Sequence, residues 1–201
     1  MDSLQCVGPS GIRTGAAEVG GGCWVNRASG GAGRRLEPER PEVAHVFAFW
    51  ENRVFYDSFM ARGHDTLAAA QAGTYKELQV KLFEYRFDVK TGFEPPRFTD
   101  ADVLRVAHSR VHEDRVEHFA LMQQRVWNPA IAGSPGMLRG IFGEAPGGHE
   151  FLVLSMWQSS AERGKYRPGS VDRLSQRAGG TEEDVAALAG DVVQLEPSWT
   201  V

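Results

Sequence analysis

The sequence predicts an α+β fold made of two tandem modules, each with its elements in the order βαββαβ. In the second half of the chain, apolar runs and amphipathic stretches alternate in that order. The first half repeats part of the pattern: Trp50 matches Trp157, which lies 157 − 50 = 107 positions later. Helices on one face of such a sheet leave the other face to be buried. We therefore expect two ferredoxin-like modules packed sheet to sheet, of which only the second is complete.

The chain opens with a glycine-rich stretch. Nine glycines fall within the first 33 residues, and residues 1–20 show neither a helical nor a strand period. We expect residues 1–20 to form a disordered Gly-rich tail. Residues 21–94 are then an incomplete first module and residues 98–201 a complete second one.

The first module should start near Cys23, in a short β-prone run. Residues 43–50 form a short apolar run, as in a buried strand. A helix is expected from Asn52 to Ala61, with Asn52 or Glu51 near its N-cap. A further helical stretch ends at Gly73, and residues 78–89 alternate like a long strand. The segment before Cys23 lacks the strand and helix that open the second module, so we expect the first module to be truncated or differently encoded there.

The second module holds the clearest helix, at 113–127, whose apolar stripe includes Met122 and Val126. The pair Asn128-Pro129 is expected to end this helix. Strands are expected at 103–111, 137–142, 151–157 and 192–195, with helical turns between 161 and 178 and a short helical turn at 185–189.

The repeat rests on several matched positions between residues 46–74 and the second module. In both copies a strand ends in Trp, an aromatic residue follows nine positions later, and a Gly-Thr pair stops the next helical stretch. The matched pairs are Val46/Val153, Trp50/Trp157, Phe59/Tyr166, Asp65/Asp172, Leu67/Leu174, Gly73/Gly180 and Thr74/Thr181. The agreement of elements and residues favours two copies of one module.

Composition excludes several classes of protein. The chain has 42% hydrophobic residues, 24% charged residues and a formal net charge of −4, which is ordinary for a soluble globular protein. It has no basic stretch for nucleic acid and no apolar run long enough to span a membrane. Two cysteines, Cys6 and Cys23, cannot make a disulfide framework or a zinc site, so we expect a cytoplasmic protein. Phosphate-loop, dinucleotide and nucleophile-elbow motifs are missing from the sequence.

Four stretches resemble the YdbC-like family. They are the run 45–50, the run 55–60, Gly133-Ser134-Pro135-Gly136-Met137, and 151–159. That family consists of two-module members of the dimeric α+β barrel superfamily, which includes the antibiotic-biosynthesis monooxygenases. The resemblance covers residues 20–201 and implies a pseudo-dimeric α+β barrel. It implies a fold more firmly than an activity, because the YdbC-like group has no settled function.

Similarity to the heme-degrading monooxygenases of this superfamily gives a test for a cofactor. Those enzymes have a Trp where this chain has Phe59 and Tyr166, a His ligand where it has Ala69 and Gln176, and an Asn where it has Ser109. Heme iron needs an axial donor. We therefore expect no heme degradation and no cofactor.

The candidate binding residues are mostly aromatic and lie where the superfamily binds its substrates, between helices and sheet. Asn128 in the loop expected after the long helix could hydrogen-bond a ligand. The complete set is Trp127, Asn128, Trp157, Tyr166, Met122, Trp50 and Phe59. Ordinary core packing is the alternative for the aromatic members.

His108 is the one candidate catalytic residue. It lies on the first strand of the second module, and an imidazole facing a cavity can act as acid or base near neutral pH. His112 and His118 follow within ten residues, but their spacing matches no metal motif, so we expect a polar rim and no metal site.

Three functions remain open from the sequence. The first is a cofactor-independent monooxygenase-like enzyme acting on a small aromatic or apolar metabolite, with His108 as its base. The second is a ligand-binding or stress-response protein without turnover, and the third is a structural relic. We expect a homodimer through the edge left by the missing strand, and neither a nucleic-acid nor a membrane partner.

Overall fold

A computed structural model describes residues 22–29, 43–50, 52–62, 64–65, 69, 77–90, 103–166 and 170–195. The chain divides into two compact units. Among the described residues, unit 1 comprises those up to Tyr85, and unit 2 comprises those from Arg86 to Leu195. The expected tail at 1–20 lies outside the described residues.

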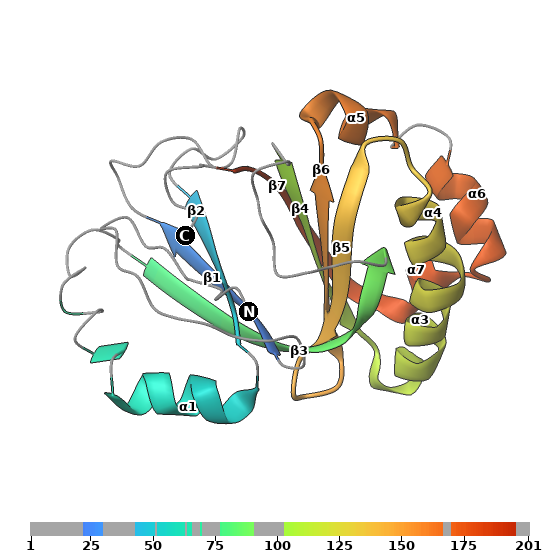
Figure 1. The fold of residues 1–201 in the computed structure, drawn as a ribbon. Helices are drawn as coiled ribbons and strands as arrows, with labels where there is room; N and C mark the ends of the chain where they lie inside the picture. Colours follow the sequence, from blue (N-terminus) through green and yellow to red (C-terminus); the bar gives the residue numbers. More distant parts are fainter. Residues whose placement is uncertain are drawn as a thin grey trace. The chain divides into compact units, whose positions relative to one another are not determined.

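Among its described residues, unit 1 contains the antiparallel strands β1, β2 and β3 and the helix α1 (Figure 1). Strand β1 (Gly22–Ser29) lies between β2 (Val43–Phe49) and β3 (Glu77–Lys90), whose last five residues belong to unit 2. Helix α1 (Arg53–Arg62) starts where Asn52 predicts, since the Asn52 Oδ1 accepts from the backbone N–H of Val54 at 2.9 Å and of Phe55 at 3.2 Å.

Unit 2 has the predicted βαββαβ order. Its four antiparallel strands lie in the order β5-β6-β4-β7. The strands are β4 (Val103–Val111), β5 (Met137–Glu144), β6 (Glu150–Trp157) and β7 (Val185–Gln194). The helices are η2 (Glu113–Arg115), α3 (Val116–Met122), η3 (Gln123–Trp127), α4 (Asn128–Ala132), α5 (Ser160–Lys165), α6 (Ser170–Arg177) and α7 (Thr181–Asp184). Figure 1 shows α3, α4 and α6 on one face of this sheet.

The long helix differs from its prediction at the C-terminal end. It does not stop at Asn128-Pro129 but continues through α4 to Ala132. The reason is η3, a π-helical turn from Gln123 to Trp127. Pro129 then falls in the first turn of the α-helical segment that follows, where a missing N–H is tolerated.

Residues 185–189 also differ from their prediction. They form the start of β7 instead of a helical turn, with Ala187 opposite Arg110 and Ala189 opposite His108 on β4. Alanine and leucine favour a helix locally, but the hydrogen bonds available along β4 outweigh this small preference.

The helix-facing core of unit 2 is a row of phenylalanines. Ring centroids lie 4.8 Å apart between Phe87 and Phe142, 5.4 Å between Phe142 and Phe151, and 5.1 Å between Phe151 and Phe119. Such offset and tilted contacts contribute about 1 kcal/mol per pair beyond burial. The row joins three strands to α3.

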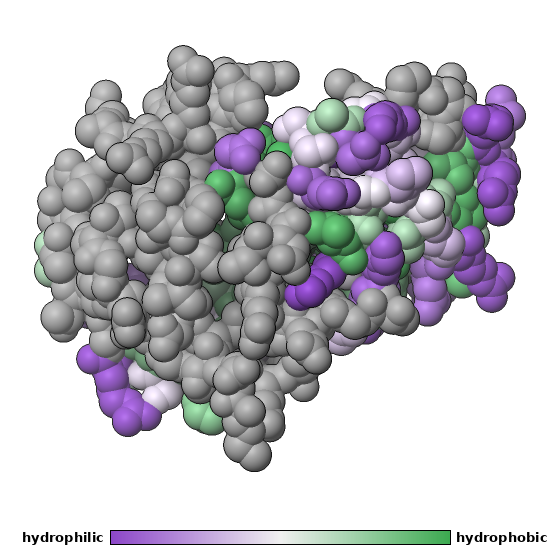
Figure 2. Space-filling model, turned by 45° about the horizontal axis from the view of Figure 1, so that its top comes forward, coloured by the Kyte–Doolittle hydropathy of each residue, from purple (hydrophilic) through white to green (hydrophobic). Residues whose placement is uncertain are grey.

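The face of the sheet away from the helices is apolar as well. Side chains on this face are between 2% and 5% exposed: Leu104, Val106, Ile141, Leu152, Leu154 and Met156. These residues lie on β4, β5 and β6, so these three strands carry buried apolar side chains on both faces. Polar and apolar side chains alternate over the described surface of unit 2 in Figure 2. Among the described residues, no helix is both long and apolar enough to cross a membrane.

Candidate functional site

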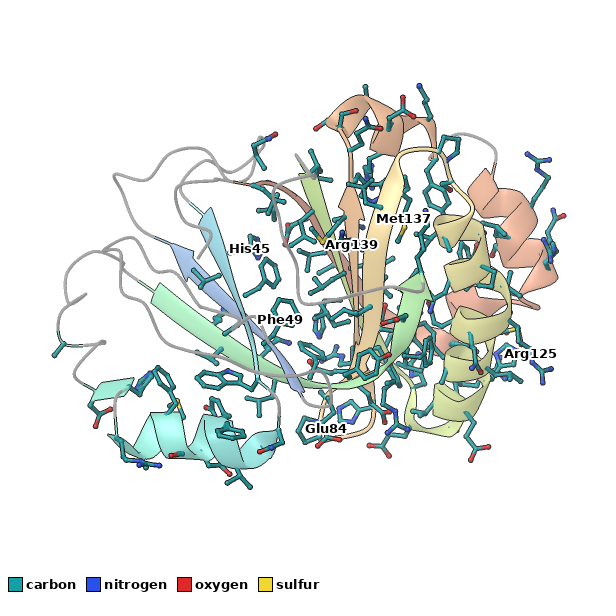
Figure 3. The ribbon with its side chains drawn as sticks, in the orientation of Figure 1. His45, Phe49, Glu84, Arg125, Met137 and Arg139 are labelled. Atoms are coloured by element: carbon teal, nitrogen blue, oxygen red, sulfur yellow. The ribbon has the colours of Figure 1, made fainter. Side chains whose placement is uncertain are left out.

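The helical segment α3–η3–α4 carries the main candidate site. Its π-helical turn ends at Trp127, immediately before Asn128. Single π-turns within α-helices are rare and are often found at functional sites, because the extra residue turns neighbouring side chains out of the regular helical register. Arg125, on the same turn, points away from the sheet (Figure 3).

Asn128 is the most unusual side chain in the segment. It is only 3% exposed, and among the residues that the structure describes, neither its amide oxygen nor its amide nitrogen finds a hydrogen-bond partner. Leaving one such buried group unsatisfied costs about 1–3 kcal/mol. Ile131, three residues later and so on the same side of the helix, packs against the core that contains Phe142 and Trp157. We conclude that the Asn128 amide faces the sheet and needs a partner there.

Trp157 and Tyr166 supply aromatic surface to the same core. Trp157, the last residue of β6, is 1% exposed, and its indole N–H donates to the Ser155 Oγ at 3.0 Å. The Tyr166 ring lies 5.9 Å from the Trp157 ring. Burial raises the pKa of Tyr166 above its usual value of 10, against a smaller opposing effect of Arg163, so the phenol stays neutral near physiological pH.

Met122 and Trp127 lie in an adjoining apolar cluster. They pack against Val126, Leu174 and Ala178, between the long helical segment and α6. Tyr166 contacts this cluster as well as the phenylalanine core. The structure thus brings together, on the helix-facing side of unit 2, five of the predicted binding residues: Met122, Trp127, Asn128, Trp157 and Tyr166.

His108 lies on the opposite face of the sheet from these residues. Ser109 is paired with Phe151 in the helix-facing core, so its neighbour His108, paired with Leu152, must point the other way. Its Nε2 lies 2.7 Å from the Glu150 Oε2, and both side chains are partly exposed, at 22% and 29%. The sequence could not show on which face of the sheet His108 lies, because the face of a strand residue depends on the register of strand pairing. A base for a helix-side pocket therefore cannot be His108.

Trp50 and Phe59 form an aromatic cluster in unit 1. Their ring centroids lie 5.0 Å apart, and Tyr56 meets Trp50 edge-on at 6.0 Å. Burial raises the pKa of Tyr56 above 10, although Arg53 opposes the shift. These residues belong to a different unit from Asn128 and are treated as a separate aromatic cluster.

An ion-pair network around a buried aspartate was not predicted from the sequence. Asp184 is 0% exposed; its Oδ1 accepts from the Arg115 Nε at 2.8 Å, and its Oδ2 lies 2.6 Å from the His118 Nδ1. The backbone N–H of His112 donates to the Asp184 carbonyl at 2.9 Å. Asp184 follows two other acidic residues in the sequence, so nothing marked it as the buried one. The network links α7 to η2 and α3, and both carboxylate oxygens of Asp184 have a partner.

A metal centre has no ligand set in the described part of the chain. No three His, Cys, Asp or Glu side chains come close enough there to hold an ion. At the heme-ligand positions compared above, Ala69 has no donor atom and Gln176 is exposed on α6.

Comparisons with known proteins identify the fold. Residues 25–83 match the model of a domain of unknown function, DUF4937, and no curated protein matches the chain. A proposed monooxygenase from Fusobacterium nucleatum superposes with a TM-score of 0.65 at 7% identity, covering 88% of this chain and 93% of that one. An anthrone oxidase-like protein superposes with a TM-score of 0.62 at 12% identity, covering 87% of this chain and 91% of that one. A Listeria monocytogenes protein related to antibiotic biosynthesis monooxygenases superposes with a TM-score of 0.50 at 10% identity, covering 88% of this chain and 95% of that one. The chain therefore has the ferredoxin-like α+β fold of these monooxygenase-like proteins.

Proposed function

We propose that this protein binds a small, uncharged, largely aromatic molecule between the helical segment α3–α4 and the sheet of unit 2. The observation that carries the proposal is the buried Asn128 amide, 3% exposed and without a hydrogen-bond partner among the described residues. A buried amide of this kind calls for a partner, and a ligand seated beside it would complete its hydrogen bonds.

The surroundings of Asn128 define the ligand. Trp157, Tyr166, Trp127 and Met122 supply apolar and aromatic surface, which suits a flat apolar body. Asn128 offers an acceptor oxygen and an NH₂ group with two N–H donors. A ligand with a carbonyl and a neighbouring hydroxyl or amide N–H satisfies both.

Monooxygenase-like turnover is the second candidate, favoured by the fold; His108, hydrogen-bonded to Glu150, would be its base only for a substrate on the opposite face of the sheet. In cofactor-independent oxygenation, a base removes a proton from an electron-rich substrate, which then reduces dioxygen. Where a CH₂ group becomes a carbonyl, one oxygen atom enters the product and the other leaves as water with both hydrogens. On the helix side, Tyr166 is not available as a base near neutral pH, because its raised pKa keeps the phenol protonated. Since His108 lies on the other face, the geometry supports binding more strongly than turnover.

The test uses 1,8-dihydroxyanthrone as the probe, because its carbonyl lies between two hydroxyls, with binding followed by tryptophan fluorescence and turnover by oxygen consumption. We expect saturable quenching in the natural protein and at least tenfold weaker binding in Asn128→Leu. Gln124→Leu is the matched control, because this amide lies exposed on the same helical segment. Equal binding by natural protein and Asn128→Leu would refute the site. Oxygen consumption abolished by His108→Ala would establish the catalytic candidate.

We also propose that the chain is a two-module relative of the YdbC-like family, with modules at 21–94 and 98–201, and that it acts in the cytoplasm. In both units a Trp at the strand end lies beside the aromatic residue nine positions later, with ring separations of 5.0 Å for Trp50–Phe59 and 5.9 Å for Trp157–Tyr166. This supports the repeat. A second copy of the chain is the proposed partner.

A further inference from the structure

Strand β7 is the outermost strand of the order β5-β6-β4-β7 in unit 2. Within the described part of the chain it pairs with β4 alone, which leaves its other edge without a strand. The residues 186–190 are all exposed, and Leu188 is 66% exposed. The strand therefore presents both an open backbone edge and an exposed apolar side chain.

The sequence of this edge lacks the usual protection against pairing. Natural edge strands carry charges, prolines or bulges that prevent another strand from adding to them. From Val185 to Gly190 the chain is Val-Ala-Ala-Leu-Ala-Gly, without a charged residue or a proline. The one irregularity in its pairing with β4 is a bulge at Ala186, opposite Arg110 and Val111, so the regular part of this edge runs from Ala187 to Gly190. A flat, uncharged edge of this kind is suited to strand addition.

We propose that two copies of this chain pair antiparallel through β7, about a two-fold axis at Leu188. This deepens the proposed self-association and is independent of ligand binding. A two-fold axis there places Leu188 opposite Leu188, Ala187 opposite Ala189, and Ala186 opposite Gly190. Small residues flank the leucine symmetrically, so the register contains no steric clash and no pair of like charges.

The charges at the ends of the strand agree with the same register. The Arg105 guanidinium lies over Gly190, in the space that a Cβ there would need, and its Nη1 donates to the Asp191 carbonyl at 3.4 Å. In an antiparallel pair, this end of β7 meets the beginning of the partner strand. That beginning follows α7, whose Glu182 and Glu183 are exposed. Each end of the paired strands then joins a cation of one copy to acidic residues of the other.

The test measures the mass of the full chain by sedimentation equilibrium, with three variants. The natural protein is expected to be a dimer, whereas Leu188→Lys and Leu188→Glu are each expected to be monomeric, because like charges would meet at the axis. An equimolar mixture of the two variants should regain the dimer, since Lys then faces Glu. Val80→Lys, at another apolar residue that is 50% exposed on β3, should remain a dimer.

Each outcome separates the general proposal from the specific one. A monomeric natural protein overturns self-association altogether. A dimer that persists in Leu188→Lys places the interface elsewhere and overturns only the β7 edge. Failure of the mixture to regain the dimer, with both variants folded by circular dichroism, overturns the two-fold register. Recovery in the mixture supports it, because a nonspecific apolar contact gives no advantage to opposite charges.

Discussion

Replacement of Asn128 by leucine should stabilise the ligand-free protein while weakening binding. The side chain is 3% exposed with two amide atoms unpaired among the described residues. At about 1–3 kcal/mol for each unsatisfied group, removal of both gains at least about 2 kcal/mol. Leucine has a similar size, so little repacking opposes the gain. For a chain of this length, such a gain raises Tm by roughly 4–8 °C.

The assay is urea and thermal unfolding of the ligand-free natural protein and of Asn128→Leu, with Gln124→Leu as the control. The exposed control should stay within about 0.5 kcal/mol of the natural protein. A loss of stability in Asn128→Leu would refute the reasoning, because it would mean that the amide makes hydrogen bonds in the ligand-free state. The residue would then have a structural role, and the proposed binding site would lose its main support.

Three further predictions concern the stability of unit 2. Asp184→Asn should lower the free energy of unfolding by about 1–3 kcal/mol, because a neutral amide replaces the buried carboxylate beside the partly exposed Arg115 and His118; an unchanged urea midpoint would contradict this. Gly140→Ala should destabilise by about 1–3 kcal/mol in the same assay, because a Cβ there would lie 2.7 Å from the Leu154 carbonyl oxygen; an unchanged midpoint would show that the strand yields freely. Because the pKa of Tyr166 is raised in the folded state, its contribution to the free energy of unfolding is complete below pH 10 and is lost as the pH rises through the folded pKa. Between pH 8 and 12 the free energy of unfolding should therefore decline less steeply in Tyr166→Phe than in the natural protein. Equal slopes would argue against a buried phenol.

Local pattern was sufficient for most elements of unit 2. The alternation and length of the apolar runs predicted β4, β5 and β6 close to their observed bounds. The helix beginning at 113 and the order βαββαβ are confirmed, as is the cap at Asn52. These features depend on contacts between residues close in sequence, or on the difference between a period of two and one of 3.6, which a single sequence displays.

The candidate site was only partly accessible to the same reasoning. The sequence predicts Asn128 in a loop beside Trp127, at a position where it could hydrogen-bond a ligand. Its burial depends on the π-turn that carries the helix past Pro129. Burial without a partner is a property of three-dimensional packing, and no sequence period reveals it.

The sequence by itself determined the fold class, the polar and apolar faces and the positions of the long elements, because hydrophobic periodicity and caps act over a few residues. Tertiary structure decided three further matters. Register placed His108 on the face opposite Trp157. Pairing with β4 made 185–189 a strand. Packing of α7 against α3 buried Asp184 between a guanidinium and an imidazole. Each depends on partners more than 40 positions away, whose energies outweigh the local preferences of the chain.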